Sequence, residues 1–131
     1  MVKTIATLLG VVFLLVGMLG FAMPGLLGAH LTPAHNVVHL VSGAVSLYLG
    51  LKGSLSATRM FALAFGAVYL LLGIAGFLLG AQQTHDGHTN ETLLSVVPGV
   101  LHFGTMDNII HLVFGSLYLI GALTTKTGNT D

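Results

Sequence analysis

Four apolar segments, each long enough to cross a lipid bilayer as an α-helix, make up most of this chain. We expect membrane spans at about residues 4–22, 33–53, 57–80 and 106–124. At about 1.5 Å per residue the second span measures about 31 Å, which matches a hydrocarbon core about 30 Å thick. Segments of this length and hydropathy are typical of membrane-spanning helices.

The composition supports a lipid environment and excludes several classes of function. Hydrophobic residues make up 54% and charged residues 6% of the 131 residues, whereas a soluble domain usually carries about 25% charged residues. The lipid bilayer is therefore the expected surrounding. The net charge is zero and there is no basic tract, so nucleic acid is not expected as a partner. The absence of Cys excludes disulfides, thiolate metal sites and thiol catalysis.

The spans repeat in order along the chain. Residues 10–21 align with residues 66–77, and residues 36–50 align with residues 108–122. Each half of the chain is therefore predicted to be a helical hairpin. Because two spans return the chain to its starting side, the halves should be parallel repeats related by a pseudo-twofold axis along the membrane normal.

These patterns predict an all-α fold, an integral membrane four-helix bundle built from two parallel-repeat helical hairpins. The whole chain, residues 1–131, is expected to form one transmembrane domain with repeat halves 1–55 and 56–131. The first span also has features of a cleaved signal peptide. Because it is the repeat partner of the third span, we expect it to be retained.

Charged and titratable residues are distributed unevenly between the two ends of the predicted bundle. All four basic residues fall at one end: Lys3, Lys52, Arg59 and Lys126. All seven histidines fall at or near the other end: His30, His35, His39, His85, His88, His102 and His111. The positive-inside rule therefore predicts a multi-pass protein of the bacterial inner membrane with both termini in the cytoplasm.

A stripe of polar and small residues runs down the second and fourth spans. Spacings of three and four residues place on one helix face Asn36, His39, Gly43, Ser46 and Gly50. The equivalent face of the fourth span carries Asn108, His111, Gly115, Tyr118 and Ala122. Glycines seven residues apart in the other two spans are Gly10, Gly17, Gly66 and Gly73. Small residues permit close helix packing and polar residues hydrogen-bond across helices, so these faces are predicted to hold the bundle together.

The repeated histidine has two interpretations. In the first, His39 and His111 each hydrogen-bond to their own neighbours and stabilise the bundle. In the second, pseudo-symmetry brings the two imidazoles together to hold a metal ion, a haem or a chlorin, because ionisable groups in a membrane are often functional. Gly43 and Gly115 would then leave room for a flat ring. A structural zinc site needs four ligands, and weaker candidates for the others are His35, Asp107, His30 and His102. No cofactor is favoured.

The connecting segments give further expectations. Thr32 and Thr105 are predicted N-caps of the second and fourth spans, with Pro33 at the first helical position. The stretch "LLSVVPGVLHF", residues 93–103, is apolar, and we expect it to lie in the membrane interface as a short broken helix.

The sequence favours a function without catalysis. It shows no paired carboxylate within a span, no phosphate-binding loop and no dinucleotide fingerprint. We therefore expect a small membrane scaffold or accessory subunit that associates with itself or with a larger complex through its glycine-rich helix faces. The alternative is a ligand-binding module that uses His39 and His111. A small permease or channel ranks third, since no charged residue lies well inside a span.

The chain resembles a family of small bacterial membrane proteins that is defined as a domain of unknown function with four spans. The resemblance is carried by a His-Asn-x-x-His-Leu-x-x-Gly motif at His35, Asn36, His39, Leu40 and Gly43. The first span adds Gly10, Gly17, Gly20, Pro24 and Gly25. Thr32 departs from the pattern, which has Asn there, and the fourth span carries a fuller motif than the family pattern. The resemblance implies the four-span architecture and no particular chemistry.

Overall fold

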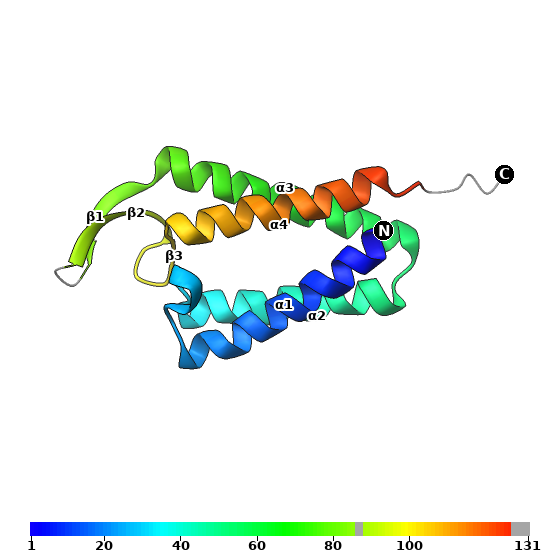
Figure 1. The fold of residues 1–131 in the computed structure, drawn as a ribbon, viewed down its shortest axis with the longest axis horizontal. Helices are drawn as coiled ribbons and strands as arrows, with labels where there is room; N and C mark the ends of the chain where they lie inside the picture. The colour runs from blue at the N-terminus through cyan, green and yellow to red at the C-terminus, as the bar shows by residue number, and fades with distance from the viewer. Residues whose placement is uncertain (86–87, 127–131) are drawn as a thin grey trace.

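The computed structural model describes residues 1–85 and 88–126, without the side chains of residues 83–91. It contains four long helices: α1 (Val2–Ala22), α2 (Pro33–Lys52), α3 (Leu55–Leu79) and α4 (Thr105–Thr124). All four are long and apolar enough to cross a membrane. The predicted all-α four-helix bundle is therefore confirmed (Figure 1). The predictions on His85 and His88 lie outside the described side chains.

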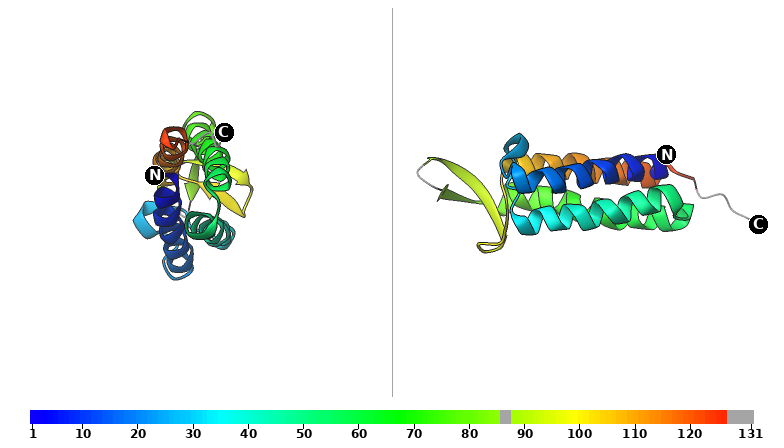
Figure 2. Two further views of the ribbon diagram at one scale, coloured as in Figure 1. Left: turned by 90° about the vertical axis from the view of Figure 1, so that its right-hand side faces the viewer. Right: turned by 90° about the horizontal axis from the view of Figure 1, so that it is seen from below.

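The helices pair in the order of the chain. Helix α1 packs along α2, and α3 packs along α4, while contacts between the two hairpins are looser. The end-on view in Figure 2 shows the helices at four corners, with α1 beside α4 and α2 beside α3. The two helices of each hairpin run in opposite directions, so the N-terminus and the end of α4 lie at the same end of the bundle (Figure 1).

The basic residues lie at this end of the bundle, and two of them contact carbonyl groups at helix ends. The Lys3 ammonium group donates to the Gly53 carbonyl at 3.0 Å, and Arg59 Nε donates to the Ala122 carbonyl at 2.9 Å. Cationic side chains are favourable there because the last carbonyls of a helix lack intrahelical partners.

The segment between α3 and α4 is a small antiparallel sheet. Its strands are β1 (Ala81–His85), β2 (His88–Val97) and β3 (Leu101–Phe103), in the order β1-β2-β3. The expectation of a broken helix over residues 93–103 is therefore wrong. A tight turn at Pro98–Gly99 causes the difference: Gly99 has φ of +73°, and the Val100 amide donates to the Val97 carbonyl. Proline followed by glycine favours this turn, and the flanking valines favour strands.

Glycines set the close approach of the helices within each hairpin. A β-carbon added to Gly43 would lie 2.9 Å from the carbonyl oxygen of Gly10, and one added to Gly115 would lie 2.6 Å from the Leu70 amide nitrogen. The structure buries all seven glycines of the predicted packing faces: Gly10, Gly17, Gly43, Gly50, Gly66, Gly73 and Gly115. Gly43 and Gly115 therefore face the backbone of a neighbouring helix, and the expected space for a flat ring beside them is absent.

Candidate functional site

Residues at equivalent positions of the two halves meet along the middle of the bundle. The rings of Phe13 and Tyr69, which occupy matching positions of α1 and α3, lie 5.4 Å apart edge to face. The hydroxyl groups of Ser46 and Tyr118, which match in α2 and α4, lie 2.6 Å apart. These contacts are what a pseudo-twofold axis between the hairpins would produce.

The Ser46 contact joins three helices. The Ser46 hydroxyl donates to the Ala6 carbonyl at 2.8 Å. A serine hydroxyl has one proton, so the Tyr118 hydroxyl is the donor in the contact between these two side chains. Ser46 and Tyr118 are fully buried, and their hydrogen bonds therefore fix the spacing of α1, α2 and α4.

Three buried imidazoles form the histidine cluster, which we define as His35, His39 and His111. Their exposed fractions are 2%, 6% and 3%. The His35 ring lies 4.3 Å from the His39 ring and 6.0 Å from the His111 ring, measured between ring centres. His35 Nδ1 lies 2.8 Å from the His30 carbonyl and must donate to it, because a carbonyl only accepts. In the neutral ring this leaves His35 Nε2 as an acceptor.

The buried carboxylate of Asp107 ties the α1–α2 loop to the start of α4. Its Oδ2 atom accepts from the Gly104 amide at 2.8 Å and from the His30 amide at 2.9 Å. Gly104 is therefore the N-cap of α4 and Thr105 is its first residue, so the prediction of a Thr105 cap is wrong. Thr32 caps α2 as predicted, since its hydroxyl accepts from the His35 amide. Asp107 Oδ1 lies 3.9 Å from His35 Nδ1, which is too far for a hydrogen bond.

The two repeated asparagines pack against glycines. Asn36 lies on Gly20 of α1, and Asn108 lies on Gly76 of α3, so closely that a β-carbon on either glycine would collide with the amide group. Among the residues that the structure describes, the Oδ1 atoms of both asparagines have no conventional hydrogen-bond partner. Each faces a glycine Cα, and Cα–H···O contacts of this kind recur where helices pack closely. Each asparagine therefore packs against a glycine of the other helix in its own hairpin.

The repeated histidines lack the hydrogen bonds that a purely stabilising role would use at Nδ1. In the part of the chain that the structure describes, Nδ1 of His39 and Nδ1 of His111 are buried and have no hydrogen-bond partner. Buried side-chain nitrogen atoms are usually paired, and leaving one unpaired costs about 1 to 3 kcal/mol. Two such atoms at repeat-equivalent positions point to a site rather than to a chance packing defect.

Both of these imidazoles line one cavity of about 210 Å³ between the two hairpins. We call it the central cavity; it is lined by Val12, Phe13, Val16, Leu26, Leu27, Ala29, Leu31, His39, Tyr69, Ile110, His111 and Phe114. Its roof is the short helix η1 (Leu26–Gly28), in which Leu27 has φ of +57°. A residue with a bulky side chain rarely adopts this left-handed backbone conformation. The roof is therefore held in a conformation that is unfavourable in free energy.

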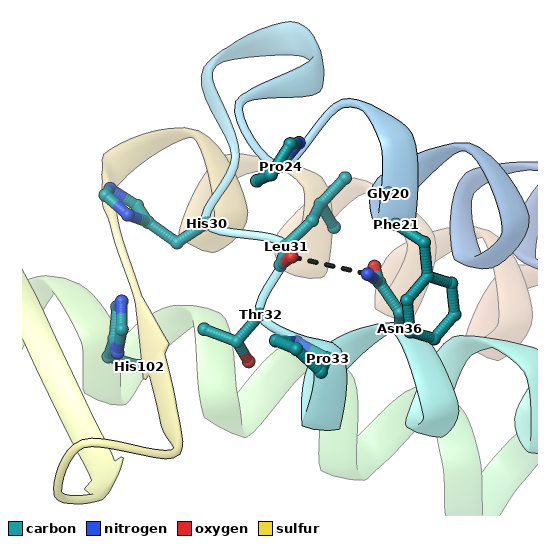
Figure 3. A pocket seen from close by; sticks show the side chains of 9 residues that line it. All are labelled: Gly20, Phe21, Pro24, His30, Leu31, Thr32, Pro33, Asn36 and His102. Carbon is teal, nitrogen blue, oxygen red and sulfur yellow. Dashed lines mark hydrogen bonds between the residues drawn. The ribbon is translucent and has the colours of Figure 1, made fainter.

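A second pocket, of about 300 Å³, opens at the loop end of the bundle (Figure 3). His30 and His102 lie on one side of Leu31 and Asn36 lies on the other, where Asn36 Nδ2 donates to the Leu31 carbonyl. The rings of His30 and His102 are 5.4 Å apart. The candidate metal ligands therefore lie in two different places. His30 and His102 line this pocket, whereas His39 and His111 line the central cavity.

The geometry limits what the histidine cluster could hold. Among the described side chains, those of residues 1–82 and 92–126, no group of three or more His, Asp or Glu is arranged to bind a metal ion. A haem or chlorin is also too large for the central cavity, because even pockets for drug-sized ligands begin at about 300 Å³. The central cavity suits a smaller, mostly apolar molecule.

Sequence analysis missed the partners of the repeated histidines. Phe13 and Tyr69 line the central cavity beside them, but an aromatic residue in an apolar span carries no signal of its own. The repeat alignment pairs these two positions and could have suggested that they meet. No comparable signal in the sequence indicated that η1 would cover the central cavity.

The comparisons with known proteins give a family and no activity. No curated protein and no solved structure matches this chain. The model of a family described as "Domain of unknown function (DUF4383)" matches residues 59–130. The match begins after the His-Asn-x-x-His motif of α2, so that motif is not part of it. The four helices of this chain are each long and apolar enough to cross a membrane, which agrees with the four-span architecture that the resemblance implied. Because the matched segment covers more than half of the chain, the protein is a member of the DUF4383 family.

Proposed function

We propose that the protein is a membrane module that binds a small neutral ring compound in the central cavity. The observation that carries this proposal is the pair of repeat-equivalent imidazoles, His39 and His111: both rings line one cavity, and their buried Nδ1 atoms have no hydrogen-bond partner among the described residues. Apart from Tyr69, the other side chains that line the central cavity are apolar. A ligand with a hydroxyl or carbonyl group would give one of these imidazoles the hydrogen bond that the protein does not supply.

The size of the cavity supports a ligand of about one ring. An apolar cavity of about 150 Å³ is enough to bind benzene, and the central cavity measures about 210 Å³. Phe13 and Phe114 offer aromatic surfaces to such a ring, and Val12, Val16 and Ile110 complete the apolar wall. A charged ligand would lose its hydration without gaining an ion pair there.

The location of the cavity supports entry from the lipid. Four side chains of the cavity wall are half-buried: Val12 and Val16 of α1, and Ile110 and Phe114 of α4. The cavity wall therefore reaches the surface of the bundle between these two helices.

The orientation of the imidazole rings also bears on binding. The torsion angle about the Cβ–Cγ bond of histidine is broadly distributed and roughly two-fold. We propose that a bound molecule turns the ring of His39 or His111 about this bond, because the Nδ1 atoms are buried away from the cavity.

The proposed role is binding without catalysis. The hydroxyl groups of Ser46 and Tyr118 are already hydrogen-bonded, and the Asp107 carboxylate is occupied by two backbone amides. These groups hold the scaffold around the cavity. A role as an accessory subunit receives less support, because the glycine faces expected to bind partners pack within the chain. A second copy or a larger complex would have to use other surfaces.

The proposed setting is the bacterial inner membrane, with both termini in the cytoplasm. The support is the placement of Lys3, Lys52, Arg59 and Lys126 at one end of the bundle and the preference of basic residues for the cytoplasmic side. A reporter fused after Asp131 should then be active in the cytoplasm, and activity on the outer side would reverse the orientation.

Binding of 4-fluorophenol and fluorobenzene to the purified protein in detergent tests the proposed function. Both compounds should raise the unfolding temperature with a saturable dose dependence, because a ligand that binds only the folded state stabilises it. The hydroxyl group should make 4-fluorophenol bind about 2- to 10-fold more tightly, since a neutral hydrogen bond contributes about 0.5 to 1.5 kcal/mol.

Variants separate the imidazoles from the cavity itself. The double variant His39→Phe/His111→Phe keeps two rings and removes their nitrogens, so it should lose the preference for 4-fluorophenol and bind fluorobenzene more tightly, because a buried hydroxyl group without a partner is costly. His30→Phe, which changes the loop-end pocket, should keep the preference for 4-fluorophenol. Equal binding of the two compounds to the unmodified protein would contradict the role of the imidazoles, and absence of saturable binding would contradict the proposed function.

A further inference from the structure

We infer that the protein has a second binding site for the same class of ligand on the opposite side of the histidine cluster. This inference rests on the proposed function. A cavity of about 180 Å³ lies between α2 and α3, and we call it the lateral cavity. Its wall includes Val38, Val68, Leu72, Tyr69, His35 and His111. The walls of both cavities therefore contain aromatic rings, two imidazoles and aliphatic side chains.

The lateral cavity is the repeat-related counterpart of the central cavity. Val68 and Leu72 of α3 occupy the positions that Val12 and Val16 occupy in α1. Val38 of α2 matches Ile110 of α4 in the same way. The pseudo-twofold relation that pairs α1 with α3 and α2 with α4 therefore predicts two sites.

The two cavities share a wall. Tyr69 and His111 line both of them, and their rings lie 4.9 Å apart. The roofs differ, because η1 covers the central cavity, whereas Val96 of β2 and Leu101 and Phe103 of β3 cover the lateral cavity. The sites are therefore similar in their walls and different in their covers, so a bound probe should experience two distinct environments.

The chemistry of the lateral cavity favours a ligand that donates a hydrogen bond. His35 lines it and gives its Nδ1 proton to the His30 carbonyl, which leaves Nε2 as an acceptor in the neutral ring. The remaining wall is aliphatic and aromatic. The class of ligand is therefore a neutral ring compound with a hydroxyl group, as phenol is.

Fluorine NMR of the purified protein with 4-fluorophenol tests this inference. Two saturable bound resonances are expected, one for each cavity. Val16→Trp should fill the central cavity and remove one resonance, and Leu72→Trp should fill the lateral cavity and remove the other. Leu15→Trp and Leu71→Trp change neighbouring side chains that are 49% and 64% exposed, and both resonances should remain in these controls.

The outcomes separate this inference from the proposed function. One resonance that is lost only in Val16→Trp would overturn the second site and leave the proposed function intact. Two resonances that are both insensitive to Leu72→Trp would also overturn the assignment to the lateral cavity. The absence of any saturable resonance would overturn both proposals. Far-UV circular dichroism and unfolding temperature of each variant establish that it is folded before its resonances are compared.

Discussion

Replacement of Asp107 by Ala should lower the free energy of unfolding by about 3 kcal/mol or more. The carboxylate accepts from the buried Gly104 amide and from the His30 amide, and a hydrogen bond to a charged group contributes about 1.5 to 3 kcal/mol. The change removes both bonds at once. It also disconnects the α1–α2 loop from the start of α4. Unfolding of the detergent-purified variant, followed by far-UV circular dichroism, measures the effect.

Asp107→Asn is the matched variant, because its amide oxygen can still accept a hydrogen bond from one of the two amides. It should lose about half as much stability as Asp107→Ala. If Asp107→Ala differed from the unmodified protein by less than about 0.5 kcal/mol, the range of ordinary surface substitutions, the proposed link between the loop and α4 would be wrong.

Gly43→Leu and Gly115→Leu should each destabilise the bundle by about 3 kcal/mol, at the upper end of the usual cost of overpacking. Each added side chain would meet backbone atoms of the neighbouring helix, at 2.9 Å or less from the β-carbon. Backbone atoms of a helix cannot turn aside as a flexible side chain can. The two effects should be similar because the glycines are repeat-equivalent. Thermal unfolding in detergent provides the comparison.

Gly25→Leu is the control for these substitutions. A β-carbon at Gly25 meets no atom within 4 Å, and its φ of −98° is accessible to any residue. This variant should therefore unfold close to the temperature of the unmodified protein. Wild-type stability of both Gly43→Leu and Gly115→Leu would mean that the two hairpins do not close on their glycine faces.

The helices could be predicted from the sequence because their signals are local or repeated. Long apolar runs mark the four spans, and a spacing of three and four residues places Asn36, His39 and Gly43 on one face. The sheet could not be predicted in this way. Residues 93–103 are apolar enough for an interfacial helix, and the pairing of β2 with β1 and β3 depends on residues distant in the sequence.

Sequence patterns singled out side chains of the candidate site but not the surroundings of those side chains. Pattern alone singled out His39, His111 and Asp107. It did not indicate that Asp107 accepts from backbone amides, or that the two repeated imidazoles have no partner at Nδ1 within the described part of the chain. Those features depend on which loop folds over the end of the bundle. The central cavity beside the imidazole rings depends on the looser packing between the two hairpins. Gly43 and Gly115, in contrast, permit the close packing of the two helices within each hairpin.

Crystals grown with 4-bromophenol would test most directly whether the central cavity is a ligand site. Diffraction data collected at the bromine absorption edge locate the bound compound. We expect an anomalous peak between α1 and α4, with the phenol hydroxyl about 3 Å from an imidazole nitrogen of His39 or His111. Bromine peaks confined to the lipid-facing surface, with both imidazoles hydrogen-bonded to protein groups, would contradict the account.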